Sequence, residues 1–295
     1  MKYRDRSGNE FNKTTKQDEF LADAYSSSMG RALMKFLSLP VFSRLSRIIM
    51  DSSLSARAID KFIEKNQIDM SEYEEREYRS FNDFFTRKIK SGKRFITKDE
   101  NILISPCDGK VSAYKIGNSS SFIIKNSVYT VNSILRDSSL AERYNGGTAL
   151  IIRLSVDDYH RYCYSCSGIK SHNRYIDGFL HTVNPVINEH YPVYKENCRE
   201  YCLIRSEKLG DVIQMEVGAL MVGKISNNER GIAKVRRGEE KGCFEFGGST
   251  IVLFVEKDKV EVCKDLIENT KHGFETKVLQ GEALACTADY GYVCQ

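Results

Sequence analysis

Hydrophobic positions recur at helical spacing in the first quarter of the chain, with polar and basic residues between them. Pro40 should separate two helices, because proline cannot donate a hydrogen bond to the preceding turn. We therefore expect one amphipathic helix before Pro40, a second after it, and a third over residues 56–66. The apolar positions are Met29, Ala32, Leu33, Phe36 and Leu37 in the first helix, Val41, Phe42, Leu45, Ile48 and Ile49 in the second, and Ile59, Phe62 and Ile63 in the third.

The pattern changes after residue 100, where short apolar runs are bounded by Gly, Asn, Asp or Ser. Few helical periods interrupt these runs, which favours a mostly antiparallel β domain over alternating strands and helices. The sequence thus predicts an α+β fold, with N-terminal amphipathic helices followed by a β domain and a boundary near residues 70–90. A short helix is expected over residues 259–269. Strands are predicted over residues 102–105, 111–115, 122–125, 149–156, 200–205, 212–217, 220–225, 250–256 and 275–279.

Composition excludes several classes of protein. With 41% hydrophobic and 28% charged residues, the chain is neither disordered nor collagen-like. Its 295 residues can bury a sizeable core without disulfides. Nine scattered cysteines indicate reduced thiols in the cytosol, and the polar N-terminus does not read as a signal peptide. No uncharged apolar run approaches the roughly 18 residues that span a bilayer.

The basic residues near the N-terminus suggest contact with a membrane surface. Residues 25–50 contain no acidic residue, and cations beside an apolar stripe suit an interfacial helix that meets anionic headgroups. The alternative is that these stripes pack on the protein's own core. The four cations are Arg31, Lys35, Arg44 and Arg47.

Asp108 and His160 are candidate reactive groups. Asp108 lies in the segment SPCDGK, which read alone is a hairpin turn between two strands. His160 follows a predicted strand, where a rigid scaffold can present a reactive side chain, and the adjacent Arg161 could hold an anion. His160, Cys163 and Cys166 also have the spacing of metal ligands, but a fourth ligand is missing, so we predict no metal site.

The third candidate is Ser249, in the segment FGGST ahead of an apolar strand. Read alone, this segment is a glycine turn entering a strand. Two glycines can also hold a strained backbone. The Ser249 hydroxyl could then attack the carbonyl of Gly248 and replace the amide by an ester. That attack needs a base for the hydroxyl proton and donors for the oxyanion, and Ser, His and Asp are the ingredients of such a site.

Six ordered segments resemble the phosphatidylserine decarboxylase family, in its shorter bacterial branch with G-G-S-T. The resemblance runs from about Tyr78 to the C-terminus, and its F-N-x-F-F-x-R and G-S-T segments are the most specific. The segments are YRSFNDFFTR at 78–87, SPCDGKV at 105–111, DYHR at 158–161, VNP at 183–185, VGA at 217–219 and FGGST at 246–250.

The resemblance implies a proenzyme that cuts itself between Gly248 and Ser249 into a β chain of residues 1–248 and an α chain of residues 249–295. Ser249 would become a covalent pyruvoyl group, which converts phosphatidylserine to phosphatidylethanolamine and CO2 through a Schiff base. Asp108 would orient the histidine and favour its charged form. Many relatives have a second histidine where this chain has Cys163, so we assign the base to His160, with Cys163 or His172 as alternatives.

The resemblance also implies a division of labour and a location. Residues 1–80 would dock on the cytoplasmic face of the cell membrane as a peripheral protein, and residues 81–295 would be the catalytic domain. The expected partners are phosphatidylserine in an anionic membrane, the two chains of one precursor and a possible second copy, with no nucleic acid. The rival hypotheses are a non-catalytic β module that binds membranes and a Cys- or Ser-dependent hydrolase built on His160.

Overall fold

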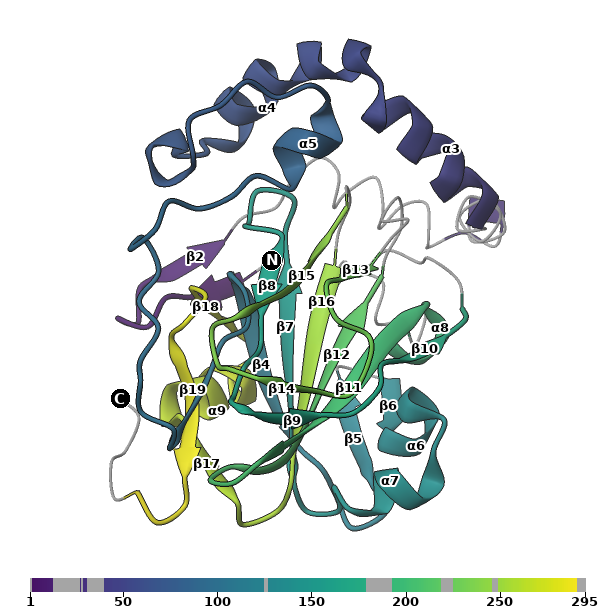
Figure 1. The fold of residues 1–295 in the computed structure, drawn as a ribbon. Helices are drawn as coiled ribbons and strands as arrows, with labels where there is room; N and C mark the ends of the chain where they lie inside the picture. The colour runs from purple at the N-terminus through teal and green to yellow at the C-terminus, as the bar shows by residue number, and fades with distance from the viewer. Residues whose placement is uncertain are drawn as a thin grey trace.

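A large, mostly antiparallel sheet forms the centre of the molecule (Figure 1). The structure is a computed structural model, and it describes residues 2–12, 27, 29–30, 40–124, 127–178, 193–218, 225–245 and 249–290. Short helices lie around the sheet and at one end of it. The α+β fold with mostly antiparallel strands is therefore confirmed.

Among the described residues, eleven strands form the central sheet. Their order is β14-β9-β11-β12-β16-β7-β4-β18-β1-β2, and β10 pairs with another part of β11. Each pair is antiparallel except β1 with β18, which is parallel. The strands are β1 (Lys2–Arg4), β2 (Glu10–Asn12), β4 (Gly109–Lys115), β7 (Thr148–Leu154), β9 (Gly168–Lys170), β10 (Arg174–Ile176), β11 (Arg199–Ser206), β12 (Gly210–Val217), β14 (Ala233–Val235), β16 (Ser249–Val255) and β18 (Glu275–Val278).

Three smaller sheets complete the described β structure. One has the order β13-β15-β8, and it holds the strand that follows His160. The others are β17-β19-β3 and the hairpin β5-β6. Their bounds are β3 (Ile102–Ile104), β5 (Ser121–Ile124), β6 (Ser127–Thr130), β8 (Arg161–Cys163), β13 (Ile225–Asn227), β15 (Glu240–Phe244), β17 (Val260–Val262) and β19 (Ala283–Thr287).

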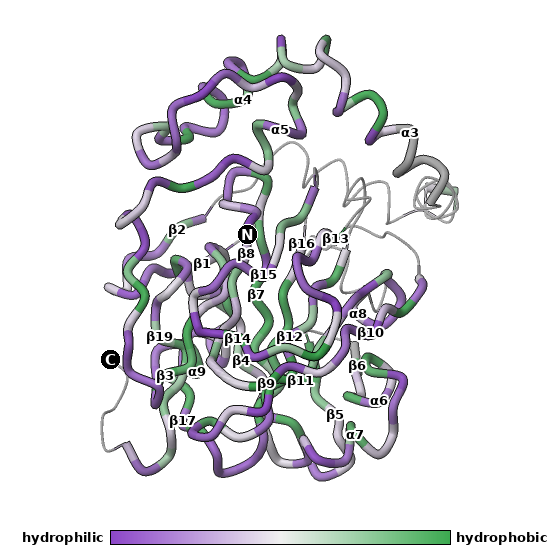
Figure 2. Tube along the Cα trace, in the orientation of Figure 1, coloured by the Kyte–Doolittle hydropathy of each residue, from purple (hydrophilic) through white to green (hydrophobic). Residues whose placement is uncertain are grey.

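The central strands are buried on both faces of the sheet. Figure 2 shows hydrophobic residues concentrated on β7, β12 and β16. Successive side chains of a strand point to opposite faces. On β16, Ile251 and Leu253 therefore join a cluster that includes residues of β8 and β15, whereas Val252 and Phe254 join the cluster on the opposite face. Strand β16 is thus a rigid support for the residue at its start.

A layer of helices lies at one end of the strands, and α5 lies between the other helices and the β structure (Figure 1). Phe81, Phe84 and Phe85 of α5 form a small core with Ile59 and Phe62 of α4. None of the described helices is long and apolar enough to cross a bilayer. The helices are α3 (Pro40–Asp51), η1 (Ser53–Ala58), α4 (Ile59–Asn66), η2 (Met70–Glu72), α5 (Phe81–Phe85), α6 (Val131–Leu135), α7 (Ser138–Glu142), α8 (Val193–Glu196) and α9 (Lys264–Lys271).

Most predicted strands are present to within two residues, as β3, β4, β5, β7, β11, β12, β16 and β18. The predicted strand over residues 220–225 lies almost wholly outside the described residues. The helix predicted over residues 259–269 was wrong in its first half. Val260 and Val262 alternate in β17, which pairs with β19, and α9 begins only at Lys264.

The predicted helical boundaries have a mixed outcome. Helix α3 begins at Pro40, where the missing amide donor costs nothing, and α4 ends at Asn66 as predicted. Residues 56–58, expected to be α-helical, belong to η1 instead. The helix predicted before Pro40 lies outside the described residues, apart from residues 29–30.

The division at residue 80 stays a prediction, and two features of the fold bear on it. The first residues of the chain are not helical, because β1 and β2 extend the central sheet beside β18. Helix α5 lies beyond residue 80, yet its phenylalanines pack in the helical layer. Residues before the predicted boundary thus contribute strands to the sheet, and residues after it contribute a helix to the helical layer.

Candidate active site

Ser249 is the first residue of β16 and has no exposed surface. It pairs with Leu154 of β7, and the next residue, Thr250, pairs with Val217 of β12. Because side chains alternate along a strand, Ser249 faces the same cluster as Ile251, on the side of β8 and β15. Its hydroxyl has no hydrogen-bond partner among the described residues. The preceding residues, 246–248, lie outside the described part of the chain.

A tight turn leads from β7 to His160. The carboxylate of Asp158 accepts hydrogen bonds from the ammonium of Lys110, at 2.7 Å, and from the amide of Ser155, at 2.6 Å. Burial opposes the charge on Asp158, but the Lys110 ammonium holds the pKa of this carboxyl below its ordinary value. The buried ion pair therefore fixes the turn that presents His160.

The imidazole of His160 is held in one orientation. Its Nδ1 lies 2.9 Å from the carbonyl oxygen of Asp158, and a carbonyl can only accept, so Nδ1 carries the proton and donates. The ring packs on Phe85 of α5, with centroids 4.0 Å apart. The other nitrogen, Nε2, is buried and has no partner among the described residues. This tautomer leaves the lone pair of Nε2 free.

Burial lowers the pKa of His160 to about 4, and the positive charge of Arg87 acts in the same direction. The nearby Asp158 carboxylate opposes this change without reversing it. His160 is therefore neutral near pH 7. A neutral imidazole with a free Nε2 is the form that accepts a proton.

His160 and Ser249 lie on the same side of the central sheet. The amide of Phe244, at the end of β15, donates to the carbonyl of His160 at 2.9 Å. The chain then runs through only four residues before Ser249. Strands β8 and β15 pack on the face toward which Ser249 points. Two of the three predicted site residues thus belong to one neighbourhood.

A fully buried ion pair supports that neighbourhood. Lys241 of β15 donates to Glu216 of β12 at 2.5 Å, and Asn227 of β13 contacts both groups. Glu216 pairs with Ile251 of β16, two residues beyond Ser249. The pair therefore ties the sheet that follows His160 to the strand beside Ser249.

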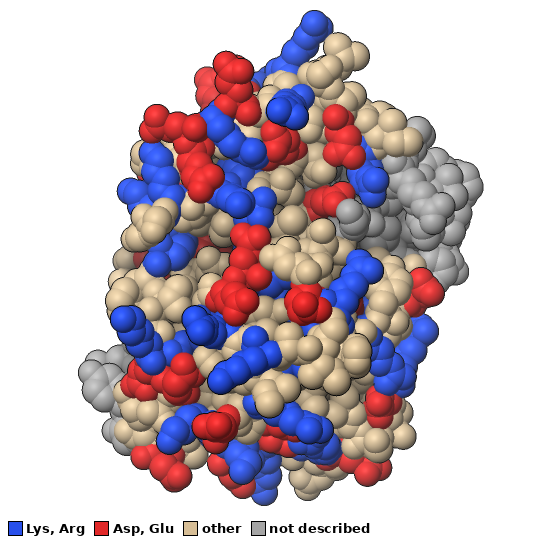
Figure 3. All heavy atoms as spheres, in the orientation of Figure 1, with Lys and Arg blue, Asp and Glu red and all other residues tan. Residues whose placement is uncertain are grey.

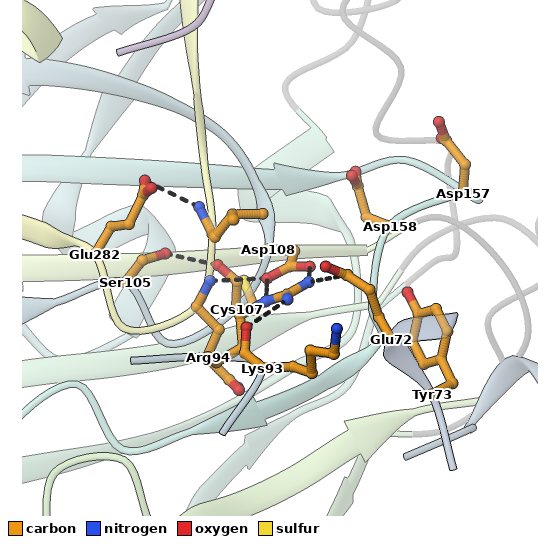
Figure 4. Close-up of polar contacts among 12 residues, drawn as sticks. Glu72, Tyr73, Lys93, Arg94, Ser105, Cys107, Asp108, Asp157, Asp158 and Glu282 are labelled. Carbon is orange, nitrogen blue, oxygen red and sulfur yellow. Dashed lines mark hydrogen bonds and ion pairs between the residues drawn. The ribbon is translucent and has the colours of Figure 1, made fainter. Parts of the chain in front are cut away.

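Asp108 has a different partner from the one expected. Arg94 binds both carboxylate oxygens, at 3.0 Å through Nε and 2.6 Å through Nη2, and the amide of Gln280 donates at 2.8 Å. Figure 4 shows Arg94 between Asp108 and Glu72. Within the described part of the chain, no hydrogen bond joins Asp108 to His160. The expected contact between these two residues is thus absent there, and the Asp158 carbonyl orients the histidine instead.

Asp108 does lie at the same end of the sheet as Ser249. Lys110 pairs with Arg153, which places Asp108 beside the end of β7, and Ser249 pairs with the last residue of β7 from the other edge. The amide of Cys163 also donates to Pro106, two residues before Asp108, at 2.8 Å. Asp108 is therefore closer in the fold to the Cys163 backbone than the sequence alone indicated.

Cys163 is a poor candidate for a nucleophile or a base. Burial raises the pKa of its thiol to about 12, and the Asp108 carboxylate adds to the rise. The reactive form of cysteine is the thiolate, which is scarce at neutral pH under these conditions. The alternative of a thiol-dependent hydrolase is thus disfavoured.

The described residues give little support for metal binding or anion binding by residues 160–166. Among the described residues, no group of three or more His, Cys, Asp or Glu side chains is placed to hold a metal ion. Arg161, which could hold an anion, is already engaged with Glu240 at 2.9 Å and with the carbonyl of Thr86 at 2.8 Å. A hollow of about 740 Å³ is lined by Ile96, Lys234, Arg236, Arg237, Gly238 and Glu239.

Comparison with known proteins identifies the family. The family model described as phosphatidylserine decarboxylase matches residues 81–286, a range that includes Asp108, His160 and Ser249. The chain belongs to the phosphatidylserine decarboxylase family. It is 47% identical over 266 residues to phosphatidylserine decarboxylase proenzyme 2 of Clostridium acetobutylicum, covering 90% of this chain and 91% of the relative.

Two further relatives match nine-tenths or more of the chain. The phosphatidylserine decarboxylase proenzyme of Clostridium botulinum strain Kyoto is 41% identical over 290 residues, covering 96% of this chain and 98% of the relative. That of Clostridium novyi is 42% identical over 275 residues, covering 90% and 92%. The similarity thus includes the helical layer as well as the β structure.

Sequence reasoning missed several residues of this decarboxylase-family site. Phe85 and Arg87 stand in the quoted segment at 78–87, but nothing in the pattern showed that they contact the histidine loop. Arg94 lies outside the quoted segments, in a polar stretch without periodicity. Its role depends on a contact across 14 residues, which only the folded chain creates.

Proposed function

We propose that this chain is the proenzyme of a pyruvoyl-dependent phosphatidylserine decarboxylase, a carboxy-lyase that forms phosphatidylethanolamine and CO2. The observation that carries the proposal is the buried, unpartnered hydroxyl of Ser249 at the start of β16, within the residues that match the family. A buried hydroxyl without a partner costs about 1–3 kcal/mol. Such a cost is typical of a group kept for chemistry.

Self-cleavage at Gly248–Ser249 follows from this arrangement. The hydroxyl oxygen of Ser249 bonds to the carbonyl carbon of Gly248 while the bond from that carbon to the Ser249 nitrogen breaks, which gives an ester and a free amine. Elimination then releases the Gly248 carboxylate and leaves dehydroalanine. Water hydrolyses this residue to a pyruvoyl group, and ammonia departs.

We assign the base for this step to His160. Its Nε2 is free, the ring is neutral at pH 7, and both His160 and Ser249 are shielded from water. The Nε2 atom would take the hydroxyl proton as the ester forms and return it to the departing nitrogen. The same nitrogen could later deliver a proton to the carbon that loses CO2.

The surroundings of Ser249 fit a pyruvoyl group. Among the described residues the Ser249 hydroxyl has no hydrogen bond to lose, and β16 holds this position in a buried setting. When present, the group supplies a ketone that condenses with the substrate amine and withdraws electrons as CO2 leaves. The apolar walls around Ser249 would exclude water and favour loss of the carboxylate.

Asp108 is proposed to act through its charge at this end of the sheet. We expect Asp108→Asn to slow self-cleavage at least a hundredfold, because it removes the carboxylate and leaves the Arg94 guanidinium buried with Glu72 alone. The measurement is the rate at which intact mass converts to the two fragments.

A matched variant separates charge from packing. Arg94→Gln breaks the same pair but keeps the carboxylate of Asp108. We expect Arg94→Gln to lower the melting temperature as much as Asp108→Asn does. We also expect Arg94→Gln to cut itself faster than Asp108→Asn. Equal cleavage rates in the two variants would mean that Asp108 serves only the fold.

Docking on an anionic membrane is proposed for the helical layer. Ile48, Ile49 and Leu54, on α3 and η1, are exposed by 68%, 55% and 67%, and Arg47 beside them is half exposed. Arg47 also reaches Glu245, four residues before Ser249, at 3.9 Å. Elsewhere on the face shown in Figure 3, acidic and basic side chains are mixed. Apolar side chains near cations, close to the chain that enters the cleavage site, suit a peripheral enzyme of a lipid substrate.

Replacing these apolar side chains should weaken membrane binding. We expect the double variant Ile48→Ser and Leu54→Ser to bind vesicles containing phosphatidylserine at least tenfold more weakly, since burying each side chain in lipid is worth about 1.5–3 kcal/mol. The measurement is vesicle cosedimentation. Ile232→Ser is the control, because Ile232 is equally exposed on the loop before β14. An equal loss of vesicle binding in Ile232→Ser and in the double variant would count against docking through α3.

The proposed function is tested by intact mass together with CO2 release from carboxyl-labelled phosphatidylserine. We expect fragments of residues 1–248 and 249–295, the smaller with a blocked N-terminus that reacts with a carbonyl reagent. A purified chain that stays whole and binds vesicles without releasing CO2 would instead support the non-catalytic membrane module.

A further inference from the structure

Arg87 is a fully buried cation whose hydrogen bonds are mostly unmade. Its Nη2 lies 3.3 Å from the hydroxyl of Tyr73 and 3.4 Å from the carbonyl of Asp157, both long contacts. Within the described residues, its Nε and Nη1 atoms have no partner, and no ion pair joins it to a carboxylate. A buried charge without a partner costs several kcal/mol. The lack of a carboxylate partner among the described residues points to an anion that arrives from outside.

The guanidinium is held in place despite lacking that partner. It lies over the ring of Tyr73, 4.3 Å from the centroid, and over the ring of Phe84, 4.8 Å from the centroid. Two aromatic faces favour a cation and fix the plane of the guanidinium. A cation held in this way loses little conformational entropy when it binds an anion in a bidentate manner.

Arg87 also lies beside the candidate base. It follows α5 by two residues, and Phe85 of α5 packs directly on the ring of His160. The positive charge of Arg87 contributes to the low pKa of His160, after the larger effect of burial. Figure 1 places α5 between the outer helices and the strands. Arg87 thus lies where the helical layer meets the catalytic residues.

We propose that Arg87 binds the phosphodiester of the phospholipid headgroup, an inference that rests on the proposed function. In the lipid, the phosphodiester lies between the acyl chains and the serine that reacts. In the protein, Arg87 follows α5, which lies between the outer helices and the strands (Figure 1), and Phe85 of α5 packs on His160. The outer helices α3 and η1 expose Ile48 and Leu54. The order of acyl chains, phosphodiester and serine in the lipid thus matches the order of exposed apolar side chains, Arg87 and candidate catalytic residues in the protein.

The phosphodiester is a better partner than the substrate carboxylate. A cation bound to the carboxylate would stabilise the group that must leave as CO2, and would therefore raise the barrier. A cation on the phosphodiester binds substrate and transition state alike, so it anchors the headgroup without this cost. Planar, bidentate donors are well suited to phosphate oxygens.

The site is closed in the uncut chain. Arg87, His160 and Ser249 each have no exposed surface. The uncut Ser249→Ala chain should therefore not bind glycerophosphoserine.

The test compares Arg87→Gln, Arg87→Lys and the wild type after processing has been verified by intact mass. With dihexanoyl phosphatidylserine we expect Arg87→Gln to raise KM tenfold to a hundredfold with a smaller change in kcat, and Arg87→Lys to recover part of the loss. Arg79→Gln is the control, because Arg79 is an exposed arginine just before α5. In the wild type, glycerophosphoserine should compete with the lipid substrate much better than inorganic phosphate does.

Several outcomes would overturn the proposal. An unchanged KM in Arg87→Gln, with an active wild type, rejects the inference while leaving the proposed function intact, whereas an inactive wild type rejects the function itself. Equal competition by inorganic phosphate would mean a general anion site. If Arg87→Gln stays uncut but melts like the Ser249→Ala chain, Arg87 acts in self-cleavage instead. If Arg87→Gln melts well below the wild type, the other measurements decide. A wild-type KM in Arg87→Lys, together with no competition by glycerophosphoserine in the wild type, would then reject the proposal.

Discussion

We expect that replacing Ser249 with alanine will leave the chain whole and abolish CO2 release. The variant lacks the only atom that can form the ester at Gly248, and alanine cannot become a pyruvoyl group. Intact mass should show one chain of 295 residues and no fragment of residues 249–295. The loss should be complete within the detection limit, because both the cut and the prosthetic group depend on the same oxygen.

The same variant should fold normally. The Ser249 hydroxyl is buried and makes no hydrogen bond among the described residues, so its removal relieves a desolvation cost instead of breaking a contact. Ser249→Cys is the matched control, since it keeps a nucleophile of similar size, and we expect slow but measurable cutting. Fragments from Ser249→Ala of the same mass as those from the wild type would refute the assignment of the nucleophile.

Replacing His160 with glutamine should slow self-cleavage by 10²- to 10⁴-fold, the usual contribution of a general base. Glutamine keeps a polar side chain of similar size but offers no basic nitrogen. The measurement is the conversion of whole chain to fragments over time. His172→Asn and Cys163→Ala are the controls, because His172 is exposed on the loop between β9 and β10 and the Cys163 thiol stays protonated. A wild-type rate in His160→Gln would assign the base elsewhere.

The pH dependence of self-cleavage gives a second test of His160. Because burial lowers the pKa of His160 to about 4, the rate should stay level from pH 7 to about pH 5 and fall by half near pH 4. An ordinary histidine would give a midpoint near 6.5. The sign for stability is the same: the folded chain binds this proton less readily than the unfolded chain, so stability is full above about pH 6.5 and declines as the pH falls toward 4. Circular dichroism must therefore show that the fold persists over the range used.

The strands of the sheet were predictable because their side chains obey local rules. The apolar run that became β16 is hydrophobic at successive positions, as expected for a strand buried on both faces. The helix predicted over residues 259–269 failed in its first half because Val260 and Val262 gain a partner in β19, and such a long-range pairing leaves little trace in a local pattern. Strand β1 was missed for the same reason, because it pairs with β18 near the other end of the chain.

The candidate site was predictable only in part. Ser249 and His160 were found from their motifs, and the fold brings their segments to one face of the sheet. Asp108 was found as well, but its partner was not, because Arg94 stands in a segment without a motif and meets Asp108 only in the folded chain. Arg87 was visible in the sequence, yet its unmade hydrogen bonds were not.

The sequence by itself determined the α+β class, since this depends on local periodicity, and it supplied the candidate reactive groups through their residue types. The proposed point of cleavage in the G-G-S-T segment came from the resemblance to the family. The tertiary structure decided which groups are charged and which are free. Burial sets the protonation of His160 and Cys163, and Arg94 forms an ion pair with Asp108. Two aromatic rings hold Arg87, which has no carboxylate partner among the described residues. Charge states and unfilled hydrogen bonds depend on neighbours that are far apart along the chain, so no local pattern can report them.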